Sequence, residues 1–144
     1  IQTVQFREAG SFELLNGGSQ VRYSLTVLPT IRGVNGALAF IPLDGITVSG
    51  SQDSGIGNWL LELDYDILAA AQSKGLQNSK ITSVEFEINN RLTAVGTEAN
   101  SGAFIDKKDF TVAVPEPSSF LFLGLVTSGA MVWQKKRRLE LVEA

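Results

Sequence analysis

The first side chains that could do chemistry are three carboxylates in the segment NWLLELDYDI, residues 58–67. Glu62, Asp64 and Asp66 alternate with apolar residues, so a β-strand would place them on one face with neighbours about 6.5 to 7 Å apart. That separation overlaps the one used by inverting glycosidases, and an envelope glycosidase using Glu62 and Asp66 is one hypothesis. An acidic row on an amphipathic strand is more often a solvated face, so we expect no catalytic residue.

The composition removes most other catalytic chemistry. The 144 residues include no cysteine and no histidine. Disulfides, thiolate nucleophiles and sulfur-ligated metal sites are therefore excluded. The usual general base near neutral pH and the Ser-His-Asp and Cys-His constellations are excluded as well. We expect a protein that is not an enzyme and has no cofactor.

Calcium binding is an alternative that the aspartates leave open. Asp44, Asp53, Asp64 and Asp66, together with loop carbonyls, could supply the hard oxygen ligands that calcium prefers. The regular spacing of a calcium-binding loop is absent, and the loop SQDSGIGN holds one carboxylate. The expected set of metal ligands is therefore empty, with calcium kept as a secondary hypothesis.

Trp59 could serve as a stacking platform for a carbohydrate. In a strand it would share a face with Leu61 and Leu63, which favours a position in the core.

The charge distribution bears on the expected partners, because residues 1–117 carry more Asp and Glu than Lys and Arg. Nucleic-acid binding depends on clustered cations, so we expect no nucleic-acid partner.

Apolar and polar residues alternate with period two in the segments that must position these side chains. The pattern is clear in residues 20–28, 58–67 and 81–89, and it predicts shorter strands at Thr3–Arg7, Ala37–Ile41, Ile46–Ser49, Leu92–Val95 and Phe110–Val114. Segments rich in Gly, Asn and Ser separate them. One short helix is expected from Leu68, with Gly75 as its stop. The fold predicted for residues 1–114 is an all-β, antiparallel, jelly-roll-like sandwich.

The C-terminal segment VPEPSSFLFLGLVTSGAMVWQKKRR has a different character. The two prolines of Pro115-Glu116-Pro117 prevent the preceding strand from continuing. Residues 118–134 are uncharged and predict a transmembrane helix, although the run is short for a bilayer core of about 30 Å. The basic residues that follow can reach lipid phosphates: Lys135, Lys136, Arg137 and Arg138.

These three parts, in this order, resemble the PEP-CTERM sorting signal. The resemblance covers about 30 of the 144 residues and implies recognition by an exosortase, a membrane processing enzyme of Gram-negative bacteria and cyanobacteria. It further implies that Pro115, Glu116 and Pro117 are the recognition element and that residues 135–138 stop transfer. The segment LELVEA, residues 139–144, departs from members that end at the basic residues and would be a short cytoplasmic tail.

The positive-inside rule places the basic block in the cytoplasm and the acidic domain on the other side. Export would require a signal peptide, removed before residue 1 unless the chain is a fragment. We therefore expect a noncatalytic structural or adhesive protein of the cell envelope, surface sheath or biofilm matrix. Its expected partners are the exosortase, the membrane, and either further copies of itself or a surface polysaccharide. A carbohydrate- or calcium-binding surface module is the alternative.

Overall fold

The computed structural model describes residues 3–17 and 19–115, which form seven strands and one helix. The prediction of an all-β antiparallel protein with one short helix is confirmed. A jelly roll has eight strands, one more than the described part of this chain. The elements are β1 (Thr3–Leu15), β2 (Ser19–Val34), β3 (Ala37–Pro42), β4 (Ile46–Gln52), β5 (Ile56–Asp66), α1 (Ile67–Ser73), β6 (Ile81–Gly96) and β7 (Gly102–Ala113).

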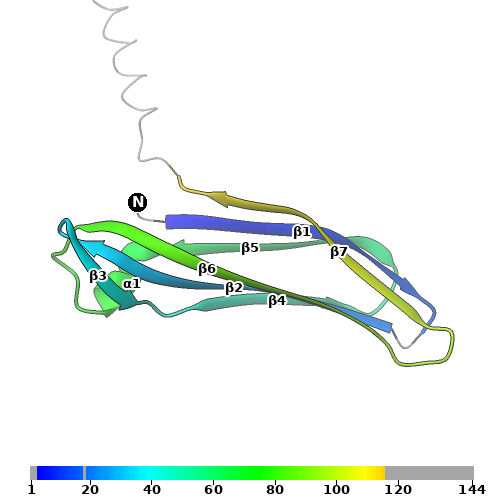
Figure 1. The fold of residues 1–144 in the computed structure, drawn as a ribbon. Helices are drawn as coiled ribbons and strands as arrows, with labels where there is room; N and C mark the ends of the chain where they lie inside the picture. Colours follow the sequence, from blue (N-terminus) through cyan, green and yellow to red (C-terminus); the bar gives the residue numbers. More distant parts are fainter. Residues whose placement is uncertain (1–2, 18, 116–144) are drawn as a thin grey trace, which may run out of the picture. The chain divides into compact units, whose positions relative to one another are not determined.

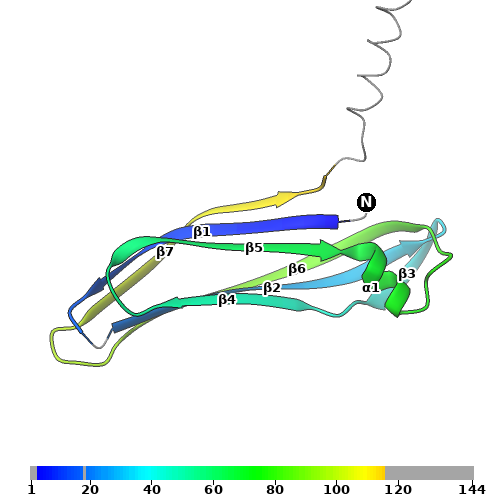
Figure 2. The ribbon, with the colours of Figure 1, turned by 180° about the vertical axis from the view of Figure 1, so that it is seen from behind.

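The strands form two antiparallel sheets, shown from opposite sides in Figures 1 and 2. We call them sheet A, in the order β5-β1-β7, and sheet B, in which β2 is central. Strand β6 pairs with one side of β2, while β4 and β3 pair with successive parts of its other side. The long strands β1 and β2 are therefore the centres of their sheets, and β6 and β7 lie at edges.

One apolar core lies between the sheets because alternate residues of the central strands point inward. In β1 the inward positions run from Val4 to Leu14, and in β2 from Val21 to Ile31. Gly10 is required by this packing, since a Cβ atom there would lie 1.9 Å from the backbone oxygen of Asp106 and 2.6 Å from the ring of Trp59. Any larger residue at position 10 would push β7 away from β1.

Helix α1 begins one residue earlier than predicted and has a clear start and stop. The Asp66 carboxylate accepts a hydrogen bond from the backbone nitrogen of Ala69 at 2.9 Å, which is the geometry of an N-cap. Gly75 follows the helix with a φ of 82°, a conformation that glycine adopts without strain. The expected stop at Gly75 is confirmed, and Asp66 has a structural role.

The predicted strands at 81–89 and Leu92–Val95 are parts of the single strand β6. The apolar alternation is interrupted at Asn89, Asn90 and Arg91. For this reason the sequence predicted two strands where the structure has one. Their backbone nevertheless pairs with Thr26, Leu25 and Ser24 of β2. The hydrogen-bonded ladder along β2 thus outweighs the weak strand propensity of asparagine.

The compact unit that contains both sheets ends at Val114. Pro115 is the last described residue, so Glu116, Pro117, the predicted transmembrane helix at 118–134 and the basic residues 135–138 lie outside the described residues. Within residues 3–17 and 19–115, no helix has the length and apolarity needed to cross a bilayer.

Candidate functional site

The carboxylates that sequence analysis singled out lie on the outer face of sheet A and make structural contacts. Glu62 forms an ion pair with Arg7 of β1, with 3.6 Å between Oε1 and Nε, and both side chains are mostly exposed. Asp66 caps α1. The row is therefore a solvated strand face in which two of the three carboxylates serve the fold.

The aspartates considered as calcium ligands do not converge. Asp44 accepts a hydrogen bond from Lys74 Nζ at 2.9 Å, and its backbone carbonyl accepts another from the Tyr65 hydroxyl at 2.8 Å. Within the described ranges no group of three or more acidic side chains is placed to hold a metal ion. The calcium hypothesis gains no support from the geometry.

Trp59 lies in the core, as its alternation with leucines predicted. Its side chain is 3% exposed and stacks on Tyr23 of the opposite sheet, with 4.9 Å between ring centroids. The indole Nε1 donates a hydrogen bond to the backbone oxygen of Asp106 at 3.0 Å. The indole thus joins both sheets and cannot offer a face to a carbohydrate.

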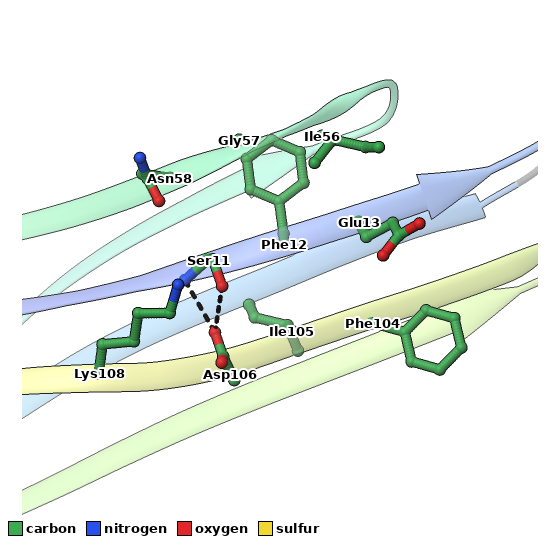
Figure 3. A pocket seen from close by; sticks show the side chains of 10 residues that line it. All are labelled: Ser11, Phe12, Glu13, Ile56, Gly57, Asn58, Phe104, Ile105, Asp106 and Lys108. Atoms are coloured by element: carbon green, nitrogen blue, oxygen red, sulfur yellow. Dashed lines mark hydrogen bonds between the residues drawn. The ribbon is translucent and has the colours of Figure 1, made fainter.

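A shallow depression of about 700 Å³ lies on the outer face of sheet A, where β5, β1 and β7 run side by side (Figure 3). Two apolar side chains in it are strongly exposed, Ile56 at 73% and Phe104 at 60%. They flank Glu13 of the central strand, since the register sets Glu13 opposite both of them. The depression is lined by Ser11, Phe12, Glu13, Ile56, Gly57, Asn58, Phe104, Ile105, Asp106 and Lys108.

The polar end of this depression is held in place by hydrogen bonds. Asp106 accepts one from the backbone nitrogen of Ser11 at 3.0 Å and one from the Ser11 hydroxyl at 2.5 Å (Figure 3). These bonds favour the ionised carboxylate and lower the pKa of Asp106. The depression therefore offers a fixed negative charge beside exposed apolar groups, which suits binding.

A buried carboxylate on β1 is a second feature, which was not predicted from the sequence. Glu8 is fully buried, and its Oε1 lies 3.1 Å from Lys107 Nζ of β7 and 3.0 Å from Asn90 Nδ2 of β6. A signal was available, because Glu8 occupies the inward phase of β1 between Phe6 and Gly10. A charged residue in that phase indicates a buried polar contact.

The predicted sorting motif follows the end of β7. Ala113 is the last residue of β7, and Val114 and Pro115 follow it in an exposed, non-helical and non-strand conformation. Glu116 and Pro117 lie outside the described residues. Neither a family model, nor a curated protein, nor a solved structure matches this chain.

Proposed function

We propose that this chain is a noncatalytic, exported protein of the cell surface or extracellular matrix, sorted by its C-terminal PEP-CTERM-like signal. The observation that carries the proposal is the ordered series of Pro115-Glu116-Pro117, an uncharged run at 118–134 and four consecutive basic residues. An uncharged run followed by a basic block is the arrangement of a membrane segment with its cytoplasmic stop. The final helix of the proposed architecture is a single transmembrane span.

The position of the motif supports this reading. Because the compact unit ends at Val114, the motif directly follows a completed domain. Strand β7 lies at an edge of sheet A and its last residues are exposed. A processing enzyme could therefore reach Pro115 without unfolding the two sheets.

The outer faces of the domain support a structural or adhesive role in place of catalysis. The candidate acid and base residues are occupied by the Arg7 ion pair and by the cap of α1. The depression on sheet A instead combines exposed apolar side chains with a fixed carboxylate. Exposed apolar groups bordered by polar ones are typical of protein or ligand contact surfaces.

Carbohydrate binding is the second candidate, and the same depression favours it. Phe104 is exposed and lines the same depression as Asn58, Glu13 and Asp106, whose side chains can exchange hydrogen bonds with hydroxyl groups. A glycan array tests this candidate, with Phe104→Ala as the variant and Phe40→Ala as the control. Phe40 is similarly exposed but lies on β3 of sheet B.

The sorting proposal is tested by replacing Pro115 and Pro117 with alanine in the full chain, in cells that possess an exosortase. We expect the variant to accumulate in the membrane fraction and to be lost from the external fraction. Pro42→Ala is the matched control, because Pro42 ends β3 far from the motif in sequence. Equal amounts of the double variant and the parent chain outside the cell would refute the proposal.

A further inference from the structure

The buried Glu8 carboxylate meets two solvent-exposed polar side chains at one edge of the space between the sheets. Glu8 comes from β1, Asn90 from β6 and Lys107 from β7. Asn90 is in the inward phase of β6, since its register partner on β2 is the fully buried Leu25. The three groups therefore come from both sheets and face one another at the edge where β6 and β7 approach.

One oxygen atom joins all three groups. Glu8 Oε1 lies 3.1 Å from Lys107 Nζ and 3.0 Å from Asn90 Nδ2. The two nitrogen atoms are therefore at most about 6 Å apart. Attack on the Asn90 carboxamide requires a rotation of the long lysine side chain to close this separation. Holding two reactants in one site gives effective molarities on the order of 10⁵ to 10⁸ M when their geometry is right.

The other carboxylate oxygen has no partner. Glu8 Oε2 is buried and makes no hydrogen bond with any described residue. Buried polar atoms are normally satisfied, so an unpaired oxygen calls for an explanation. General acid-base catalysis of amide exchange requires a carboxyl in contact with both the amine and the amide, with an oxygen free to accept or donate a proton. Glu8 has these contacts, and its Oε2 is such an oxygen.

We propose that Lys107 and Asn90 form an intramolecular isopeptide bond, with Glu8 as the catalytic acid and base. This inference goes beyond the proposed function and does not depend on it. The bond joins the edge strand of sheet B to the edge strand of sheet A. It would covalently connect the two sheets of a chain that has no cysteine.

The proton and bond changes balance without an outside reactant. In the proposed reaction Glu8 accepts a proton from the Lys107 ammonium, which frees the lone pair of the amine. The free amine then attacks Asn90 Cγ, the new C–N bond forms, and the bond from Cγ to Nδ2 breaks. Of the three ammonium protons, one stays on the new amide, one leaves with ammonia, and one remains on Glu8 or protonates the ammonia.

The surroundings of Lys107 and Asn90 leave a path by which the released ammonia can escape. Phe110 lies against Lys107, with its ring centroid 4.6 Å from Nζ, so the amine has an apolar as well as an ionic neighbour. Asn90 and Lys107 both keep contact with solvent, whereas Glu8 does not. Ammonia can therefore escape from the edge while the catalytic carboxyl stays buried.

Mass spectrometry of the full purified chain tests this inference. The parent chain is expected to be lighter than its sequence by the mass of one ammonia. Trypsin should no longer cut after Lys107, and a branched peptide should join residues 81–91 to residues 92–108. A parent chain with the mass of its sequence would overturn the proposal.

Variants assign the roles. Glu8→Gln preserves shape but cannot take the proton, and Lys107→Arg preserves charge but removes the nucleophilic amine, so each should have the full mass of its sequence. Lys108→Arg, at the neighbouring residue that lines the outer depression, should still lose ammonia. Circular dichroism confirms that each variant is folded, and the second substitution serves if the first does not fold.

Three other results would also overturn the inference. Ammonia loss that persists in Glu8→Gln would remove Glu8 from the chemistry. Loss of water, with Lys107 joined to Glu8, would show that the carboxyl is the reactant. Ammonia loss located at another asparagine, with no branched peptide, would show cyclisation at that asparagine in place of a cross-link.

Discussion

The interior between the sheets has two regions that bury side chains in opposite ways. Around Trp59 the core is aromatic, with Tyr23 stacked on the indole at 4.9 Å and the single indole N–H satisfied. Around Glu8 the interior is ionic, and one carboxylate oxygen is unsatisfied. The first region follows the ordinary rules of a core, whereas the second departs from them.

The difference indicates which region is built for stability alone. Apolar burial and a satisfied N–H are enough to explain the Trp59 region. A buried ion pair gives uncertain stability, because desolvation offsets the attraction between the charges. The isopeptide bond proposed above would account for this arrangement of Glu8, which stability alone does not explain.

The largest expected effect comes from removing the indole. Trp59→Ala should lower the free energy of unfolding by about 3 to 5 kcal/mol, because it leaves a cavity between the sheets. Chemical denaturation followed by circular dichroism measures the change. Leu60→Ala, on the half-exposed outer side of the same strand, should change it by less than about 1 kcal/mol. Similar losses for both variants would contradict the assignment of Trp59 to the core.

The second prediction concerns the ionic region. Compared with Lys107→Arg, which keeps the cation and also cannot form the cross-link, Lys107→Ala leaves Glu8 buried without its cation. Removing one partner of a fully buried pair costs about 3 to 5 kcal/mol, and we expect a smaller loss here because the Lys107 side chain is 33% exposed. Lys108→Ala should have almost no effect. A double variant in which Glu8 is also replaced by leucine should regain much of the stability in the same denaturation assay. No recovery in the double variant would show that the loss does not arise from the unpaired carboxylate.

A smaller effect is expected at alkaline pH. Burial, followed by the nearby negative charge of Asp44, raises the pKa of Tyr65 above 10.0. A raised pKa contributes stability that is complete below the unfolded value and is lost as pH rises through the folded value. Tyr65→Phe should therefore flatten the fall in melting temperature above about pH 10. If the melting temperature of Tyr65→Phe falls with pH as steeply as that of the parent chain, ionisation of Tyr65 does not cause the fall.

The smallest effect is expected at the helix cap. Asp66→Ala removes the acceptor for the Ala69 N–H and should lower stability by about 1 kcal/mol. Asp64→Ala, one alternation earlier on the same exposed face, is the control and should be neutral. Urea denaturation measures both variants. Equal effects of the two substitutions would show that Asp66 does not stabilise α1 as a cap and is a solvated carboxylate like Asp64.

The presence of the strands and the position of Trp59 could be predicted from sequence, because a half-buried strand alternates apolar and polar residues. Their lengths could not, since β1 extends eight residues beyond the predicted Thr3–Arg7 and β7 begins eight residues before the predicted Phe110–Val114. The helix stop at Gly75 was predictable for a similar local reason. The continuity of β6 was not predictable, because it depends on backbone pairing with β2, which continues across the two asparagines. The meeting of Glu8, Asn90 and Lys107 depends on how two sheets face each other, which alternation within one strand does not encode.

The proposed function depends most directly on the fate of the C terminus. The deciding measurement is mass spectrometry of the C-terminal peptide from protein recovered from its native cells, with membrane and external fractions collected separately. We predict that the external form ends near Pro117 and lacks residues 118–144. An intact chain through Ala144 in every fraction would contradict processing by an exosortase and would make the tail a permanent part of the protein.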